Sequence, residues 1–271
     1  MPDATDWRTL DRAGLSRAYD NSGAVAGSAD IVAGWRARSA AFREGRPEAL
    51  DLAYGPGERQ RIDLFRSRQP SAPMLAFLHG GYWQRNGREG FSCMAEGPLA
   101  LGLDVALIGY TLAPEASLTA IADETRAALR LLRADCGDRR IVVAGWSAGG
   151  HLAALAAAEA DAGLAISGIF DLAPIAGTAL NDALCLTEAE IDALSPIRHV
   201  GPGAPPVAVI YGAEELPELR RQSEAYHAAR RAAGLADPLM ALPGLNHFTV
   251  LDALIRPDGA IAREAARLAG L

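Results

Sequence analysis

Residues 140–151 read Arg140-Ile-Val-Val-Ala-Gly-Trp-Ser-Ala-Gly-Gly-His151, and this stretch decides the fold. Its first part, through Val143, is an apolar, β-branched run typical of a buried strand. Gly145–Gly149 fits G-x-S-x-G, and a helix rich in Ala and Leu is expected from about His151 to Ala160. A strand, a sharp turn and a helix form the context in which this motif exposes a reactive serine. Ser147 is therefore the candidate nucleophile.

Composition and charge exclude several classes of partner. The 271-residue chain is 50% hydrophobic, with a net charge of −7 and a pI near 5.3. All 26 basic residues are arginines scattered among acids, so nothing favours nucleic-acid binding. Met1–Arg46 lacks the apolar core of a signal peptide, and no run is long enough to cross a membrane. The odd cysteine count (Cys93, Cys136, Cys185) without C-x-x-C is typical of free thiols in a reducing compartment. We therefore expect a soluble cytoplasmic protein.

The order of the expected elements predicts the fold class. The expected strands are 49–54, 61–65, 74–79, 104–110, 141–143, 164–169, 206–211 and 239–242. The expected helices after the first hairpin are 91–101, 118–132, 151–160, 216–234, 248–255 and 260–268. The first two strands flank a Gly-Pro-Gly-Glu turn and form an antiparallel hairpin. The later strands alternate with helices, which predicts an α/β fold with a mostly parallel central sheet and flanking helices.

We expect a single domain, 1–271. A helical lead-in covers about 5–46. An insertion of about 171–200 occupies a crossover between two strands and is longer than a crossover needs, so we interpret it as a cap above the sheet.

A serine hydroxyl needs a base to remove its proton, so a histidine is expected downstream of Ser147. His247 lies in Pro243–Phe248, a loop between the last strand and a helix, which is where the base follows a turn of this kind. The other four histidines fit structural or surface positions better: His79, His151, His199 and His227. His247 is therefore the candidate base.

The acid that orients the base is expected after the strand 206–211. Three glutamates compete there, Glu214, Glu215 and Glu218, and spacing alone does not choose among them. Glu218 best fits a solvated acid at the start of a helix.

A turn upstream supplies candidate oxyanion donors. His79-Gly80-Gly81-Tyr82-Trp83 follows a buried strand, and its two glycines allow backbone N–H groups to turn inward. Together with the N–H of Ala148, Gly80 and Gly81 would form an oxyanion hole.

These residues resemble those of α/β-hydrolases, and within them the kynurenine formamidase (arylformamidase) and small carboxylesterase group. The matching segments are His79–Gln84, Tyr110–Glu115, Gly145–His151, Pro217–Ser223 and Asn246–Phe248. The resemblance runs from about Ala49 to the C-terminus.

The resemblance carries expectations about the site. Tyr82-Trp83 replaces the third glycine of many related esterases, as in formamidases. The family pattern around Pro217 and Ser223 implies Glu215 as the acid, although formamidases often carry aspartate there and Leu219 replaces an aromatic residue. Glu214 remains the alternative.

We therefore expect a serine hydrolase without metal or cofactor that acts on a small-molecule amide or ester. The resemblance implies an arylformamidase of the N-formylkynurenine type, with Tyr82 and Trp83 narrowing the acyl pocket around a formyl group. A carboxylesterase or amidase for small acyl or aryl esters is the alternative, and a non-catalytic binding protein of the same fold is a third reading. A homodimer is the working expectation for the oligomeric state.

Overall fold

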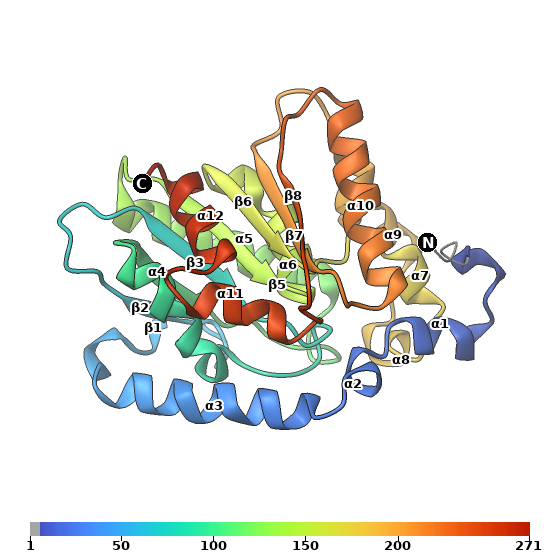
Figure 1. The fold of residues 1–271 in the computed structure, drawn as a ribbon, viewed down its shortest axis with the longest axis horizontal. Helices are drawn as coiled ribbons and strands as arrows, with labels where there is room; N and C mark the ends of the chain where they lie inside the picture. The colour runs from blue at the N-terminus through green and yellow to red at the C-terminus, as the bar shows by residue number, and fades with distance from the viewer. Residues whose placement is uncertain (1–5) are drawn as a thin grey trace.

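The computed structural model describes residues 6–271, so Thr5, the first residue of the predicted lead-in, lies outside the described residues. An eight-stranded sheet runs through the molecule in the order β1-β2-β4-β3-β5-β6-β7-β8 (Figure 1). The strands are β1 Leu52–Ala53, β2 Arg61–Phe65, β3 Met74–Leu78, β4 Asp104–Ile108, β5 Ile141–Trp146, β6 Ala162–Ile166, β7 Val207–Gly212 and β8 Leu239–Leu242. β2 pairs antiparallel with β1 and β4, and all the other neighbouring pairs in the sheet are parallel. The predicted hairpin and mostly parallel sheet are confirmed.

Helices cover both faces of this sheet (Figure 1). They are α1 Arg12–Ala18, α2 Asn21–Ala24, α3 Ser28–Glu44, α4 Glu96–Ala100, α5 Leu118–Cys136, α6 Ala148–Leu155, α7 Ala173–Ala176, α8 Asn181–Leu184, α9 Glu188–Leu194, α10 Pro217–Ala232, α11 Asp252–Ile255 and α12 Ala260–Ala269. Alternate residues of β3 belong to two separate cores. Met74, Ala76 and Leu78 pack with side chains of α5, α6 and α10, while Leu75 and Phe77 pack with those of α3, α11 and α12. A strand buried on both faces needs apolar side chains at every position, which explains its continuous apolar run.

Two predicted helices begin elsewhere than expected. The segment 91–101 is split into a 3₁₀ helix, Arg88–Ala95, and the short α4. Pro98 explains the break, because proline lacks an N–H and is tolerated only in the first turn of an α-helix. The helix after Ser147 begins at Ala148 and not at His151. Glycines 149 and 150 are therefore helical, and their close packing against neighbouring backbone outweighs their low helix propensity.

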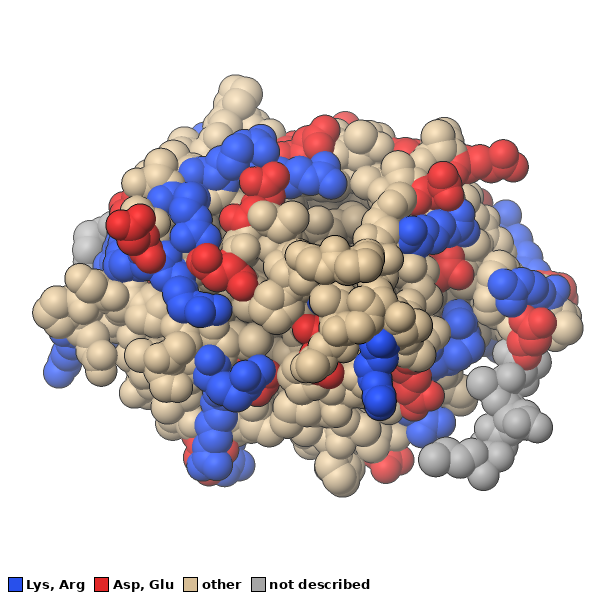
Figure 2. Space-filling model, turned by 90° about the horizontal axis from the view of Figure 1, so that it is seen from above, with Lys and Arg blue, Asp and Glu red and all other residues tan. Residues whose placement is uncertain are grey.

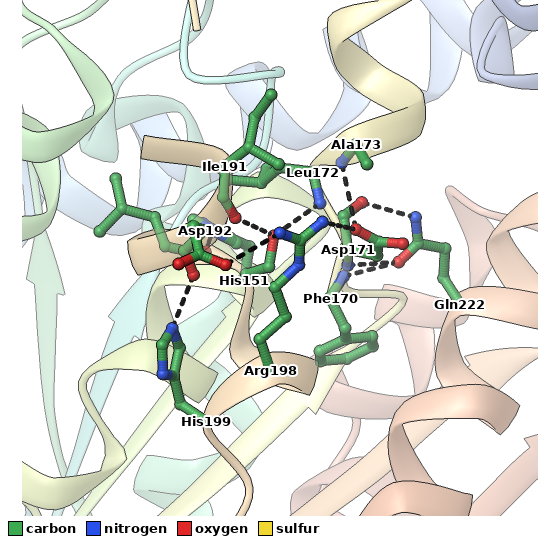
Figure 3. Close-up of polar contacts among 12 residues, drawn as sticks. His151, Phe170, Asp171, Leu172, Ala173, Ile191, Asp192, Arg198, His199 and Gln222 are labelled. Atoms are coloured by element: carbon green, nitrogen blue, oxygen red, sulfur yellow. Dashed lines mark hydrogen bonds and ion pairs between the residues drawn. The ribbon is translucent and has the colours of Figure 1, made fainter. Parts of the chain in front are cut away.

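The lead-in and the insertion lie side by side, although they are distant in sequence (Figure 1). Arg12 of α1 pairs with Asp182 of α8 at 2.6 Å, and the N–H of Ala179 donates to Ser16 Oγ at 3.0 Å. The start of the insertion is fixed to α10 (Figure 3): Gln222 Oε1 accepts from the N–H of Asp171 at 2.8 Å. These contacts bring both segments to the same end of the sheet.

Charged side chains are mixed on the surface. On the face shown in Figure 2, arginines and carboxylates alternate across an otherwise uncharged surface. Among residues 6–271, no helix combines the length and the apolar character that crossing a membrane requires.

Candidate active site

Ser147 sits at the tip of the turn between β5 and α6, in an uncommon backbone conformation. Its φ is 58° and its ψ is −117°, a region that a residue with a side chain rarely adopts and that costs about 1–3 kcal/mol. The N–H of Ser147 donates to the carbonyl of Ile166, at the end of β6, at 2.8 Å. This bond and the packing of β5 and α6 hold the strained turn in place.

Two glycines allow that turn to close. A Cβ on Gly145 would lie 2.1 Å from the carbonyl oxygen of Gly149, and a Cβ on Gly149 would lie 2.0 Å from that of Leu78. Both contacts are with backbone, which cannot move aside cheaply. Gly145 is therefore required by its close approach to the first turn of α6, and Gly149 by its close approach to the end of β3.

Glu215 and His247 form a buried pair. Glu215 Oε2 lies 3.1 Å from His247 Nδ1, and both side chains are at most 4% exposed. The other oxygen, Oε1, accepts from Ser167 Oγ at 2.6 Å and from the N–H of Gly212 at 2.7 Å. Because Oε1 is occupied, Oε2 is the oxygen that faces the imidazole. A carboxylate in this position fixes the ring orientation and leaves Nε2 as the nitrogen that can act on a serine.

The two competing glutamates lie elsewhere. Glu214 is exposed. Glu218 is buried, accepts from Tyr19 Oη at 2.7 Å and pairs with Arg221 at 2.6 Å. The interpretation of Glu218 as a solvated acid is therefore wrong, because the lead-in folds over the start of α10 and covers it. Burial, and next the charge of Glu218, keep the pKa of Tyr19 well above its ordinary value, so this phenol is the donor.

His247 is also held through its backbone. Trp146 Nε1 donates to the carbonyl oxygen of His247 at 2.7 Å, and the two rings are 5.0 Å apart. Ser147 and His247 line the same cavity, of about 320 Å³. The nucleophile candidate and the base candidate therefore meet at one cavity wall.

The Gly-Gly turn lies against this elbow. A Cβ on Gly80 would be 2.6 Å from the Trp146 ring, and Gly81 has a φ of 123°, which favours glycine. Ala148 is the first residue of α6, so its N–H has no acceptor within the helix. Within residues 6–271, neither Gly81 nor Ala148 donates its N–H to another residue. Both groups are available to an oxyanion.

Tyr82 and Trp83 diverge in position although they are adjacent in sequence. Tyr82 lines the cavity. Trp83 is fully buried, packs edge-on against His151 with ring centroids 4.9 Å apart, and is absent from the cavity lining. The Trp83 side chain therefore packs in the core against His151 and does not line the cavity.

Two other histidines are core residues. Burial lowers the pKa of both His79 and His151 to about 4, so both rings are neutral at pH 7. His151 Nε2 bonds to the carbonyl of Leu194 at 2.8 Å, and His79 stacks on Tyr110 at 4.3 Å. His151 therefore occupies a structural position, in agreement with the sequence-based prediction.

The cavity has a wall that sequence reasoning missed. Besides Tyr82 and the elbow, it is lined by the lead-in, with Asn21, Ser28, Val32 and Arg36. No local pattern marks these residues, because their place in the site depends on how α2 and α3 cross the sheet end. In residues 6–271, no group of three or more His, Cys, Asp or Glu is arranged to hold a metal ion.

The chain is similar to several known hydrolases in sequence and in fold. The sequence profile of the family described as BD-FAE matches residues 62–169. The kynurenine formamidase of Danio rerio is 26% identical over 292 residues, covering 98% of this chain and 99% of that protein. Esterase LipQ of Mycobacterium tuberculosis is 30% identical over 249 residues, which cover 77% of this chain and 59% of LipQ. The crystal structure of a candidate thioesterase from Silicibacter sp. TM1040 superposes with a TM-score of 0.83 at 28% identity, covering 92% of this chain and 97% of that one.

The sheet order, the strained serine after β5 and the likeness to these proteins define the class: the chain has the α/β-hydrolase fold. Within that class its relatives are kynurenine formamidases and esterases, and the chain is a hydrolase.

Proposed function

We propose that the chain is a serine hydrolase that deformylates aryl formamides of the N-formylkynurenine type. The observation that carries the proposal is the buried Glu215–His247 pair at the cavity that Ser147 lines. Similarity to kynurenine formamidases over nearly the whole of both chains supports the substrate class.

The proposed reaction gives each of these groups a role. His247, oriented by Glu215, takes the proton of Ser147 as its oxygen attacks the formyl carbon. The N–H groups of Gly81 and Ala148, with Gly80 beside them, stabilise the oxyanion. His247 then protonates the leaving aryl amine, and water releases formate from the acyl-enzyme by the same path in reverse.

The rim of the cavity supports an anionic substrate. Arg36 and Arg85 line it. Within the described residues neither guanidinium pairs with a carboxylate, in contrast to most arginines of this chain. A guanidinium without a carboxylate partner suits the carboxylate of an amino-acid substrate, because it offers two parallel donors to the two oxygens.

A carboxylesterase for small acyl or aryl esters is the second candidate. Esterases LipQ and LipC of Mycobacterium tuberculosis support it, at 30% and 29% identity. The same groups would cleave an ester, since only the leaving atom differs.

A substrate panel separates the two. Rates on N-formyl-L-kynurenine, formanilide and p-nitrophenyl esters of increasing acyl length are measured for the wild type and for Ser147→Ala. If the chain is a formamidase, kcat/KM should be highest on N-formyl-L-kynurenine, and kcat/KM on the esters should fall steeply from acetyl to longer acyl groups. It also expects Arg85→Gln to lower kcat/KM for N-formyl-L-kynurenine and not for formanilide, which has no carboxylate. A preference for longer acyl esters would favour the esterase, and near-full activity of Ser147→Ala would contradict the mechanism.

We further propose a single cytoplasmic domain that forms a homodimer, with the insertion 171–200 as a cap. Three free cysteines support the cytoplasmic location, and the contacts between lead-in and insertion support a single domain. Cell fractionation, analytical ultracentrifugation and a single cooperative unfolding transition are the tests.

A further inference from the structure

Asn21, the first residue of α2, is a buried polar residue in the wall of the catalytic cavity. The residue is 4% exposed, and it lines the cavity together with Ser147 and His247. It also lines a neighbouring cavity of about 360 Å³, which shares Tyr82 and Arg85 with the first. Asn21 therefore lies in the partition between the two cavities.

The hydrogen bonds of Tyr82 fix the orientation of this amide. Tyr82 Oη lies at hydrogen-bond distance from the carbonyl oxygen of Tyr19, which only accepts, so the phenol proton lies on that bond. Burial raises the pKa of Tyr82 well above its ordinary value, so the proton stays on the phenol. Tyr82 Oη can then only accept from Asn21, and Asn21 Nδ2 donates to it at 2.9 Å. The amide must present Nδ2 to Tyr82.

The other end of the amide is left without a partner. Asn21 Oδ1 is buried and accepts no hydrogen bond from any described residue. A buried carbonyl oxygen in this state is costly, because it has lost its water and gained nothing in return. The cost is recovered when a ligand supplies a donor. Since Oδ1 only accepts, that donor must be an N–H or O–H group.

We propose that Asn21 Oδ1 accepts a hydrogen bond from an N–H group of the bound substrate. The inference rests on the proposed function and deepens it, because a formamide carries an N–H where an ester carries an oxygen that cannot donate. An acceptor at this place discriminates against analogues that lack the donor. Where the donor is the scissile formamide N–H, the lead-in would thus supply the selectivity for amides over esters that the serine, histidine and glutamate alone do not provide.

The N–H could belong to either of two parts of the substrate. One source is the scissile formamide N–H, and the other is the α-ammonium group of an amino-acid substrate. Formanilide carries only the first, and 2-amino-4-oxo-4-phenylbutanoate carries only the second. N-methylformanilide keeps the formamide and has no N–H, so it is the matched control compound.

The experiment measures binding without requiring cleavage. Each compound, in large excess, protects Ser147 from labelling by a fluorophosphonate probe, and the concentration for half protection is determined. The wild type is expected to bind formanilide more tightly than N-methylformanilide. Asn21→Leu is expected to weaken the binding of formanilide roughly tenfold and to leave the binding of N-methylformanilide unchanged. If the loss falls on the ammonium compound instead, the α-ammonium group is the donor and the proposal holds for that source.

Two further variants keep the result interpretable. Tyr82→Phe removes the hydroxyl that orients the amide. It is therefore expected to reduce the ratio of the half-protection concentrations of N-methylformanilide and formanilide, although Asn21 is still present. Asn181→Leu makes the same substitution in α8, outside the cavity lining, and should lower stability without changing the ratio.

The proposal would be overturned if Asn21→Leu bound formanilide and N-methylformanilide more weakly by the same factor, or if it bound all three compounds as tightly as the wild type. The cleavage rates of the same compounds are recorded separately. If the wild type binds formanilide but does not cleave it, the proposed function fails while the binding ratio still decides the role of Asn21.

Discussion

Trp146 donates its indole N–H to the carbonyl oxygen of His247 at 2.7 Å. The residue that precedes the strained serine therefore fixes the loop that carries the imidazole. Strand β5 ends at Trp146, and the loop follows β8 at the far end of the sheet order. One hydrogen bond thus joins the two segments that carry Ser147 and His247, and the proposed proton transfer depends on their relative position.

Removing this bond should slow turnover without abolishing it. Trp146→Phe keeps most of the aromatic packing and deletes the donor, so the His247 loop loses a fixed contact and kcat should fall roughly tenfold. Steady-state kcat and KM on the best substrate of the panel are the measurement. Trp35→Phe is the matched control, because Trp35 packs on Trp146 with centroids 5.5 Å apart but leaves the bond to His247 intact. Equal kcat losses in both variants would assign the effect to packing.

Replacing each neighbouring glutamate by glutamine tests which of them acts as the acid. Glu215→Gln keeps the shape but removes the charge that stabilises the imidazolium, so kcat should fall by about 10²–10⁴. Glu214→Gln should stay within about twofold of the wild type, because Glu214 is exposed. The kinetics are measured for both variants at pH 7. A severe defect in Glu214→Gln with a mild one in Glu215→Gln would contradict the assignment.

Two glycines should respond to alanine in opposite directions. Gly149→Ala forces a Cβ to 2.0 Å from the carbonyl oxygen of Leu78, and we expect it to lower the free energy of unfolding by about 3 kcal/mol or more. Gly34 lies inside α3, and a Cβ there meets nothing within 4 Å. Gly34→Ala should therefore raise the free energy of unfolding by about 0.5–1 kcal/mol. Urea unfolding measures both, and a stable Gly149→Ala would show that the elbow is looser than the structure indicates.

Acid should destabilise the fold through two buried imidazoles. His79 and His151 have a pKa of about 4 in the folded state, against about 6.5 in the unfolded chain. Between pH 6.5 and pH 4 the unfolded chain binds protons that the folded chain does not, so stability falls as the pH falls through this window. Each ring contributes a loss of roughly 3 kcal/mol by pH 4.

The measurement is the free energy of unfolding at pH 7 and at pH 4.5. His151→Gln should reduce the difference between the two values, even if it lowers both. His199→Gln is the control, since His199 is exposed and should leave the difference unchanged. An unaltered pH dependence in His151→Gln would argue against the buried-imidazole explanation.

The sequence by itself determined the order of strands and helices and hence the sheet. Runs such as Met74–Leu78 are apolar at every position because both faces of the strand are covered, and that requirement is visible without coordinates. The G-x-S-x-G turn could also be recognised from the sequence, because tight backbone packing excludes a Cβ at Gly145 and Gly149.

The tertiary structure decided what depends on the direction of side chains in loops and on segments brought together from far apart. Glu214 and Glu215 are consecutive in one loop, and only its path shows that Glu215 faces His247 while Glu214 faces solvent. In the sequence, Glu218 resembles a solvated acid at the start of a helix. In the structure it is covered by Tyr19, which lies 199 positions away. Asn21 also lines the cavity only because the lead-in folds against a distant part of the chain. Local sequence patterns record the covering of strands and helices, whereas contacts between distant segments leave no periodic signal in either partner.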